Sequence, residues 1–579
     1  PVDPHDSVRN LNKLEAEGAS GPYGYYEALD YTPERLPIGQ KCGIVKSYMA
    51  HHQGMSLVAL NNYLNGNVMQ NRFHNDPIVD AAKLLLQEKV PANIIFTKEN
   101  KEKIVPFTDV TFDVEDSLRE YEQPDFELPK AHILSNGSYS VMLTDRGTGY
   151  SRSNTIDVTR WREDITLDNY GIFFYIRNTN TNTTWSSTYS PVEKKPDMYN
   201  VVFTSGVAKY HRKDGDIDTL TEIVVSSGDN AEIRRLTFTN HGNEACVLEV
   251  SSYYELVLAH HSADVAHPAF SNLFIRTEFV PELNCLIANR RPRSENDKAV
   301  WSLNLMTLEG EGLGGLQYET DRFKFMGRGR NASNPVVIEQ NKPLTNSVGP
   351  VLDPIMSMRS MIKVEPGKMA RVNFVVAVGE SREAVLDMAA KYINQDIIPE
   401  EFNLAATRSR VEARYLNLKA SEIEFYQELL SHILFLSPAQ RLRKDCIANN
   451  TKGQSGLWSY GISGDLPIVL LTLEKTDDID IVYDLLKAHE YWKYKNLKVD
   501  LVILNEEENS YANPLQGLLA DILSSSHAHD MINKPGGVFV LKQSNLPEED
   551  VNLICAAARV VLRGGAGDLK EQLYTKKDR

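Results

Sequence analysis

Residues 232–240 read Glu-Ile-Arg-Arg-Leu-Thr-Phe-Thr-Asn, and a polar His-Gly-Asn-Glu turn follows at 241–244. The stretch mixes β-branched and aromatic residues with polar ones in a partial two-residue alternation, which is typical of a strand. The glycine-containing turn then reverses the chain. These residues therefore predict a strand and a reversal, the unit from which antiparallel sheets are built.

Segments of the same kind recur from residue 131 to residue 378, where Gly, Asn and Asp turns separate short runs rich in Val, Ile, Thr, Tyr and Phe. Examples are Ser138–Leu143, Ile172–Arg177, Asn200–Ser205, Val207–His211, Asp218–Val225, Ala245–Leu256, Ser302–Leu308 and Met369–Val378. So many strands over about 250 residues predict a large antiparallel β-sandwich rather than a small module.

The regions on either side carry the longer apolar period of helices. Residues 1–90 have it, with a second helix over Ile78–Val90 that Pro91 ends. Further helices are expected at 380–392, 400–417 and 421–435, and then at Asp477–Lys495, Pro514–Leu523 and Pro547–Leu562, around a strand-like Val499–Leu504. We expect five parts in a multidomain α+β chain: helices at 1–90, a connector at 91–130, the sandwich at 131–378, linker helices at 379–440 and further helices at 441–579.

Composition narrows the class of protein. The chain has 579 residues, enough for about three to four domains. Its net charge of −16 argues against a general nucleic-acid binder and against adsorption to an anionic membrane, and favours neutral ligands. We find no leader-like N-terminus and no apolar run of about 18 residues.

Five cysteines are scattered without short spacings, so we expect neither a zinc motif nor a disulfide framework. Such a sparse set fits a reducing compartment, and the expected location is cytoplasmic.

The stretch from Tyr23 to Leu64 has the chemistry of a sugar site. Aromatic rings stack on pyranose faces, and carboxylates do acid/base work or bind hydroxyls. Here the carboxylates are Glu27 and Asp30, and the aromatic or polar candidates beside them are Tyr25, Tyr48, His51, His52 and Gln53. Adjacent histidines on a helix point about 100° apart and cannot chelate one ion together, so no metal is expected.

Several motifs resemble the cyclic β-1,2-glucan synthase family. Tyr-Gly-Tyr-Tyr-Glu-Ala-Leu-Asp-Tyr-Thr at 23–32, with Ser-Tyr-Met-Ala-His-His-Gln-Gly-Met-Ser at 47–56, is similar to the end of its glycoamylase-like domain. Asn-Gly-Ser-Tyr-Ser at 136–140 and Thr-Arg-Trp-Arg-Glu-Asp at 159–164 resemble the start of its cellobiose-phosphorylase-like region. Gly-Gln-Ser-Gly-Leu-Trp at 453–458 and Gly-Ile-Ser-Gly-Asp-Leu-Pro at 461–467 resemble the opening of that region's helical barrel.

The resemblance implies an architecture. It predicts the last helices of an α/α toroid, then a β-supersandwich of carbohydrate-binding type, linker helices and the first part of an α/α barrel. In the family, that barrel carries a catalytic aspartate in an Asp-Trp-Asn-Asp type motif, and this chain contains no such motif. The family's membrane glycosyltransferase part has no counterpart here either. We therefore expect a fragment of a longer protein.

The resemblance also implies roles for particular residues. Glu27 becomes the candidate catalytic carboxylate; the alternative is that it and Asp30 only bind hydroxyls. Trp161 could stack a sugar while Arg160 and Arg162 hold an anion, the alternative being an inter-domain salt bridge with an aromatic plug. Trp458 and Asp465 would lie at the barrel mouth, or else in a tight turn between helices.

Two functions follow as expectations. The first is a carbohydrate-active protein of the glucan synthase or glycoside phosphorylase type, incomplete as an enzyme, whose expected ligands are β-glucan oligosaccharides and inorganic phosphate. The second is a non-catalytic module that binds carbohydrate and controls chain length. Neither needs a cofactor, nucleic acid or a membrane anchor within this chain.

Overall fold

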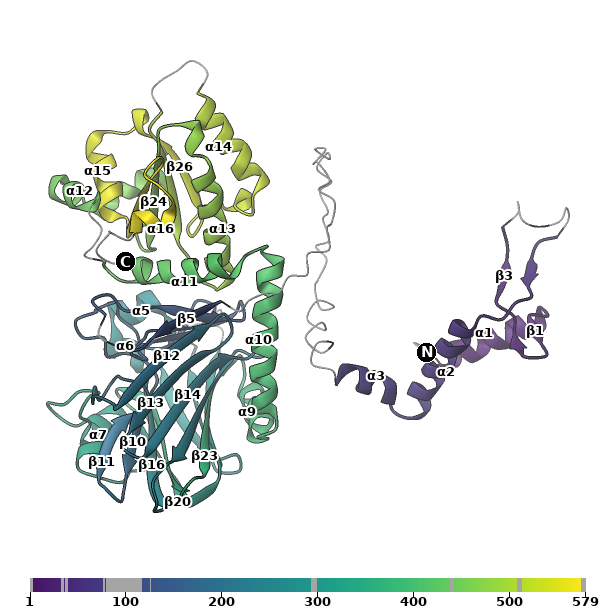
Figure 1. Ribbon diagram of the computed structural model, residues 1–579, viewed down its shortest axis with the longest axis horizontal. Coiled ribbons are helices and arrows are strands. Elements are labelled where there is room, and N and C mark those ends of the chain that lie inside the picture. The colour runs from purple at the N-terminus through teal and green to yellow at the C-terminus, as the bar shows by residue number, and fades with distance from the viewer. Residues whose placement is uncertain are drawn as a thin grey trace. The chain divides into compact units, whose positions relative to one another are not determined.

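The computed structural model describes residues 4–32, 36, 40–75, 79, 117–124, 126–292, 299–437, 442–507 and 513–573. The chain divides into two compact units, Pro1–Pro106 and Phe107–Arg579 (Figure 1).

The first unit joins helices to two small hairpins. Its elements are α1 (Pro4–Ala16), β1 (Ser20–Gly21), β2 (Gly24–Tyr25), β3 (Ala28–Asp30), β4 (Gly43–Val45), α2 (Ala50–Leu64) and α3 (Val68–His74). The tyrosine-rich stretch is therefore not helical, because Gly24 takes a φ of 108° and turns the chain back between β1 and β2. The helix expected at Ile78–Val90 lies outside the described residues.

The second unit contains the predicted sandwich, whose first layer is a ten-stranded antiparallel sheet. In spatial order its strands are β21 (Gly349–Pro350), β17 (Ile275–Val280), β18 (Cys285–Arg290), β19 (Val300–Glu309), β23 (Met369–Gly379), β15 (Ala231–Asn240), β14 (Ile217–Val225), β13 (Ala208–Asp214), β12 (Met198–Thr204) and β5 (Leu118–Tyr121). Through β5, part of the expected connector belongs to this sheet.

A nine-stranded sheet forms the second layer. Its main path is β11 (Thr183–Ser186), β10 (Phe173–Asn178), β16 (Cys246–His260), β9 (Ile156–Thr159), β8 (Gly149–Ser153), β7 (Tyr139–Leu143) and β6 (His132–Ser135). The strand β22 (Pro354–Val364) pairs with β16, and β20 (Glu311–Asp321) pairs with β22. The α+β class with a large antiparallel sandwich is thus confirmed.

The environment of strand β15 (231–240) explains why its apolar and polar residues alternate only in part. Leu236 and Phe238 enter the core between the two sheets, whereas Ala231 and Ile233 face a second core outside. Glu232 and Arg234 are also buried, and their side chains satisfy each other in an ion pair 2.8 Å long. Because both faces of the strand are covered, apolar and polar residues do not alternate cleanly.

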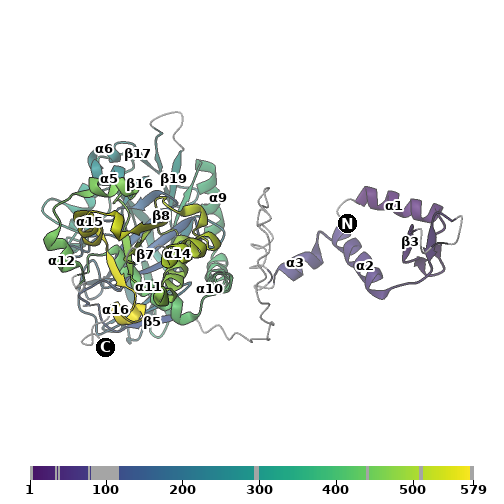
Figure 2. The same cartoon turned by 90° about the horizontal axis from the view of Figure 1, so that it is seen from above.

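Helices cover the outer face of the ten-stranded sheet. They are α9 (Arg382–Ile393) and α10 (Ile397–Tyr415), which lie along one flank of the sandwich in both views (Figures 1 and 2). Next comes α11 (Ala420–Leu434), which lies between the sandwich and the C-terminal elements (Figure 1). The three linker helices predicted from the sequence are therefore confirmed.

Residues 468–563 form an open parallel sheet, which corrects the expected start of an α/α barrel. Its strands are β24 (Ile468–Leu473), β25 (Asp500–Asn505), β26 (Val538–Lys542) and β27 (Val560–Arg563), in the order β26-β25-β24-β27. One face packs on α11, α13 (Asp480–Tyr494), α14 (Pro514–Ser525) and α16 (Leu569–Leu573), and the other on α15 (Glu548–Ala557) and the 3-10 helix η2 (Gln454–Tyr460).

The parallel sheet was not predicted because its strands lack the sequence pattern of antiparallel strands. A parallel strand buried on both faces is an unbroken apolar run, such as Ile-Val-Leu-Leu-Thr-Leu at 468–473, and lacks the two-residue period of antiparallel strands. The helix expected at Pro547–Leu562 is in fact α15 followed by β27.

A disulfide joins Cys446 of α12 (Leu442–Asn449) to Cys555 of α15, with 5.9 Å between the Cα atoms. No disulfide framework was expected from the sequence, and this pair was not predicted. The pair is 109 residues apart in sequence, so only the packing of α12 on α15 brings the thiols together. None of the helices in the described ranges is both long and apolar enough to cross a bilayer.

Candidate functional site

In the first unit, Glu27 and His52 are brought together. Glu27 follows the first hairpin, and its amide donates a hydrogen bond to the Val45 carbonyl at the end of β4. His52 lies in the first turn of α2, and its Nδ1 contacts Glu27 Oε1 in a hydrogen-bonded ion pair. The Glu27 side chain is only 9% exposed, whereas that of His52 is half exposed. A shielded carboxylate bonded to an imidazole is a pair that can exchange a proton.

Tyrosines adjacent to this pair in the sequence pack against one another. The Tyr48 ring lies 5.4 Å from that of Tyr26 and meets the Tyr23 ring edge-on at 5.7 Å. Both tyrosines and Tyr25 belong to the first hairpin or its flanks. A Cβ at Gly21 would lie 2.3 Å from the Tyr48 hydroxyl, so a larger residue there would displace this tyrosine ring.

The remaining candidates of this unit are placed differently. Asp30 accepts a hydrogen bond from the Thr32 amide (2.9 Å) at the end of β3. The His51 ring lies beside that of His52, with 4.0 Å between centroids and the planes tilted by 57°, and Gln53 is exposed on the same helix. Among the described residues, no group of three or more His, Cys, Asp or Glu side chains is placed to hold a metal ion.

In the sandwich, Arg160 and Arg162 are bonded to the protein itself. Arg160 donates to Glu255 (2.7 Å) and to Asp264 (3.1 Å), and Arg162 donates to Asp264 (2.6 Å). Burial acts to raise the pKa of Asp264, but hydrogen bonds and charge from the two arginines outweigh it and lower that pKa. This network holds the loop that presents Trp161.

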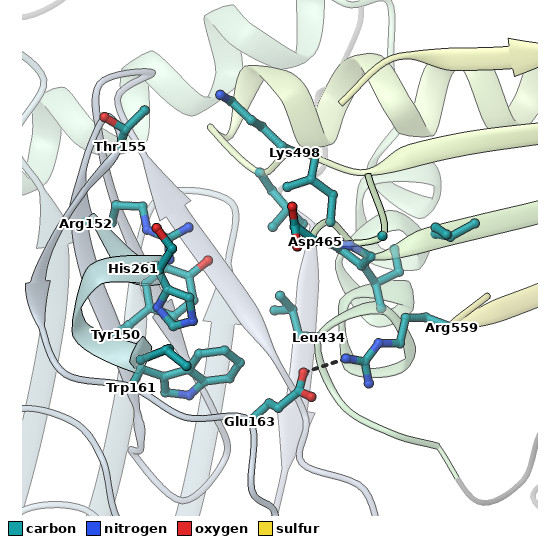
Figure 3. Close-up of a pocket in the computed structure, with 18 of the residues that line it drawn as sticks. Tyr150, Arg152, Thr155, Trp161, Glu163, His261, Leu434, Asp465, Lys498 and Arg559 are labelled. Atoms are coloured by element: carbon teal, nitrogen blue, oxygen red, sulfur yellow. Dashed lines mark hydrogen bonds and ion pairs between the residues drawn. The ribbon is translucent and has the colours of Figure 1, made fainter. Parts of the chain in front are cut away.

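Trp161 lines a pocket of about 810 Å³ between the sandwich and the C-terminal sheet (Figure 3). Its ring meets Tyr150 of β8 at 5.5 Å and Phe435 after α11 at 5.9 Å, both edge-to-face. These contacts fix the indole orientation from two sides, so its position does not depend on a bound ligand.

The opposite wall is the amino edge of the parallel sheet. The residues before β24, β25 and β27 supply it, with Asp465, Lys498 and Arg559 among them (Figure 3). Asp465 is exposed and accepts a hydrogen bond from Gln454 (3.0 Å). The structure therefore puts Trp161 and Asp465 in the same pocket, although the sequence offered no reason to pair them.

One ion pair joins the two walls of the pocket, and further ion pairs involve residues that line it. Arg559 on the sheet side donates to Glu163 on the sandwich side at 2.7 Å (Figure 3). His261 and Arg152 both bond the buried Asp157, at 2.7 and 2.6 Å.

Behind the sheet wall, burial raises the pKa of Asp500 to about 6; a hydrogen bond from the Gly536 amide opposes this shift and the charge of Asp465 adds to it.

Trp458 is not part of this pocket lining. It belongs to η2, is 63% exposed, and donates from Nε1 to the Ser463 carbonyl at 3.2 Å. Gln454 donates to the same carbonyl (2.8 Å), so the Gly-rich segment is braced as a turn before Asp465.

The chain was compared with known proteins. The family model described as glycosyl hydrolase 94, supersandwich domain, matches residues 114–395, and the glycoamylase model, described as "Putative glucoamylase", matches residues 1–77. The cyclic beta-(1,2)-glucan synthase NdvB of Rhizobium meliloti (strain 1021) is 33% identical over 574 residues, or 99% of this chain. The chain is thus similar to a cyclic β-(1,2)-glucan synthase over almost all of its own length.

The chain spans 20% of the length of NdvB. Two N,N'-diacetylchitobiose phosphorylases are more distant relatives. The protein of Vibrio proteolyticus is 23% identical to this chain, over 45% of this chain and 32% of its own length. The protein of Vibrio furnissii is 22% identical, over 56% of this chain and 38% of its own length.

Several pocket residues of this chain were not predicted as site residues. Glu163 lies inside the motif recognised at 159–164, so a sequence signal for it was present, whereas Tyr150 lies outside the quoted motifs. Arg443, Lys498 and Arg559 come from three separate segments that carry no motif. Only the fold of the parallel sheet brings them to one edge, and that fold was not expected.

Proposed function

We propose that this chain is part of an enzyme that makes or remodels β-glucan, and that the pocket holds a stretch of the glucan. The support is that Trp161 and Asp465 line one pocket, on facing walls. An indole offers an apolar face to a pyranose, and a carboxylate accepts hydrogen bonds from its hydroxyls. Homology to a cyclic β-(1,2)-glucan synthase supports a β-1,2-linked chain as the ligand.

Within the pocket, we favour binding over bond cleavage. Glycoside hydrolysis uses two carboxyl groups: one is a carboxylic acid that donates a proton, and the other is an ionised carboxylate. Here Glu163 is bonded to Arg559 and Asp465 to Gln454, which suits fixing a ligand. This observation favours the second candidate function, a carbohydrate-binding and chain-length-controlling module, for this part of the chain.

Acid/base chemistry we assign instead to Glu27 in the first unit. Its contact with His52 and the tyrosines beside it support a role in transglycosylation. Tyr25, Tyr48, His51 and Gln53 would then form the sugar-binding surroundings, with Asp30 holding the hairpin. A second carboxylate is needed for that reaction and is not assigned.

Calorimetric titration with β-1,2-gluco-oligosaccharides tests the pocket. The wild-type chain binds, and Trp161→Ala weakens binding at least about tenfold because the stacking surface is lost. Tyr415→Ala is the control, because this exposed aromatic ring at the end of α10 lies outside the pocket lining. Equal loss in both variants would contradict the assignment.

Incubation with β-1,2-glucan and phosphate tests turnover. We expect no glucose 1-phosphate, because the Asp-Trp-Asn-Asp type motif is absent from this chain. Its release would overturn the binding role. Any change in glucan length without phosphate is expected to disappear in Glu27→Gln and to persist in Glu15→Gln, an exposed glutamate of α1.

A further inference from the structure

The helix α12 contributes little apolar surface to the elements on which it lies. It has eight residues, and a helix of this length is not stable by itself in water. Among its described side chains only Arg443 is buried and Cys446 is partly exposed, whereas Ile447 is 53% exposed. Its other described side chains are exposed as well; they are Lys444, Asp445, Ala448 and Asn449. Apolar burial, which keeps most short helices in place, therefore contributes little here.

The structure describes two links from α12 to α15. One is the disulfide between Cys446 and Cys555, and the other is the hydrogen bond from Arg443 Nη2 to the Ala556 carbonyl at 3.0 Å. The second link carries a cost, because Arg443 is 9% exposed and its buried Nε has no hydrogen-bond partner. Burial, and then the charge of Arg559, lower the pKa of Arg443, so this cation is less stable here than in water.

The disulfide lies beside the pocket. The helix α12 supplies Arg443 to the pocket lining, and α15 ends at Ala557, which also lines it. After α12, Lys452 bonds Asp550 of α15 at 2.7 Å, so the chain stays attached there when the helix moves. Breaking the disulfide can thus release one part of the pocket wall while the sheet behind it stays folded.

We propose that Cys446 and Cys555 form a thiol–disulfide switch, which fixes α12 in the pocket wall when oxidised and releases it when reduced. Cys446 is partly exposed, whereas Cys555 is 7% exposed, so a thiolate from solution reaches the Cys446 sulfur first. Without the disulfide, the unfavourable burial of Arg443 is no longer offset, and the helix leaves its position.

The reductant is a small dithiol. One of its thiolates bonds to the Cys446 sulfur and expels the Cys555 thiolate, which takes up a proton. The second thiolate of the dithiol then bonds to the first sulfur and expels the Cys446 thiolate, which is protonated in turn. Two electrons pass from the dithiol to the protein, and the dithiol leaves as a cyclic disulfide. A small-molecule disulfide reverses the reaction by the same exchange.

Limited digestion of the full chain with trypsin, with and without dithiothreitol, measures the release. Lys444 is exposed on α12, and a protease cuts after it only when the helix opens locally. We expect reduction to speed this cleavage by about tenfold or more. Cleavage after Lys487 of α13, whose side chain bonds Glu422 at 3.2 Å, is the internal reference and stays unchanged. An equal increase at Lys487 would mean that the C-terminal elements unfold together, and would overturn the proposal.

Cysteine variants assign the effect. Cys446→Ser/Cys555→Ser is cut after Lys444 at the rate of the reduced wild type, with or without dithiothreitol. The matched control is Cys246→Ala/Cys285→Ala, which removes two buried thiols of the sandwich and keeps the full response. Oxidation of the reduced wild type with glutathione disulfide restores slow cleavage. Slow cleavage of Cys446→Ser/Cys555→Ser, or failure of reoxidation to restore protection, contradicts the switch.

Calorimetric titration with a β-1,2-gluco-oligosaccharide tests control of the pocket, the half of the proposal that rests on the proposed function. The oxidised chain is expected to bind several-fold more tightly than the reduced chain, because its pocket wall is fixed. Equal affinities in the two forms would overturn control of the pocket. If neither form binds while cleavage after Lys444 still depends on the reductant, the glucan pocket is wrong and the release of α12 stands.

Discussion

Asp145 shows how one buried group makes the sandwich sensitive to pH. It is 1% exposed, its Oδ1 accepts from the Lys130 amide at 2.7 Å, and its Oδ2 has no hydrogen-bond partner. Burial, helped by the charge of Asp168 and opposed by the Lys130 hydrogen bond, raises its pKa to about 7. In the unfolded chain the pKa of an aspartate is about 3.9.

Between these two values the folded state binds more protons than the unfolded state, so stability falls as pH rises from about 4 to 7. Asp145→Asn removes this dependence, because an amide there is never ionised and still accepts from Lys130. We expect the variant to match the wild type near pH 4 and to exceed its free energy of unfolding by about 4 kcal/mol above pH 7.

Urea unfolding of both proteins from pH 4 to pH 8 measures this difference. A difference that stays constant across the range would contradict the assignment of the titration to Asp145.

At the scale of elements, α12 is held to the C-terminal sheet by the disulfide between Cys446 and Cys555. The helix also donates the Arg443 side chain to the Ala556 carbonyl at the end of α15. The disulfide closes a loop of 109 residues, and cross-links over long loops restrict the unfolded chain strongly.

Reduction is therefore expected to lower the free energy of unfolding by about 2–5 kcal/mol. Thermal unfolding with and without a thiol reductant measures the effect. A Cys446→Ser/Cys555→Ser variant should melt like the reduced wild type and should not respond to reductant. A response of that variant would point to one of the other cysteines, Cys42, Cys246 or Cys285.

Elements also differ in how far their sequence predicts them. Strands such as 231–240 and the linker helices could be found because a period, however mixed, runs along each of them. The strand at 468–473 has no period, since both of its faces are buried, and residues of this kind are equally compatible with a buried helix.

The residues of the candidate site also differ in whether the sequence predicts them. Trp161 and Asp465 lie in recognisable motifs, and each was predicted as a ligand residue. Arg443 and Arg559 meet only after α12 and β27 have packed, and no local pattern encodes that meeting.

At the scale of the molecule, the two units differ in what stabilises them. The second unit has a continuous core between its sheets, in which Trp185 is 1% exposed. Among the described residues of the first unit, only Ala19 and Asn62 are buried, and Leu57 on α2 is 67% exposed. Apolar burial, the main source of folding free energy, is thus concentrated in the second unit.

We expect Trp185→Ala to lower the free energy of the main unfolding transition by about 3–5 kcal/mol, because a large side chain leaves the core. Leu57→Ala should change it by less than about 0.5 kcal/mol. Scanning calorimetry of both variants provides the measurement. A large effect of Leu57→Ala would mean that the first unit takes part in that transition.

The order of strands in the C-terminal sheet has a consequence for how the chain is made. The central strand β24 pairs with β25 on one side and with β27 on the other. During synthesis, β25 follows soon after β24, but β27 is translated only after residues 474–559 have emerged. Until then one side of β24 presents free amide and carbonyl groups beside an apolar run, the combination that promotes pairing between neighbouring chains. Newly made chains are therefore most exposed to aggregation in the interval before Val560–Arg563 leaves the ribosome.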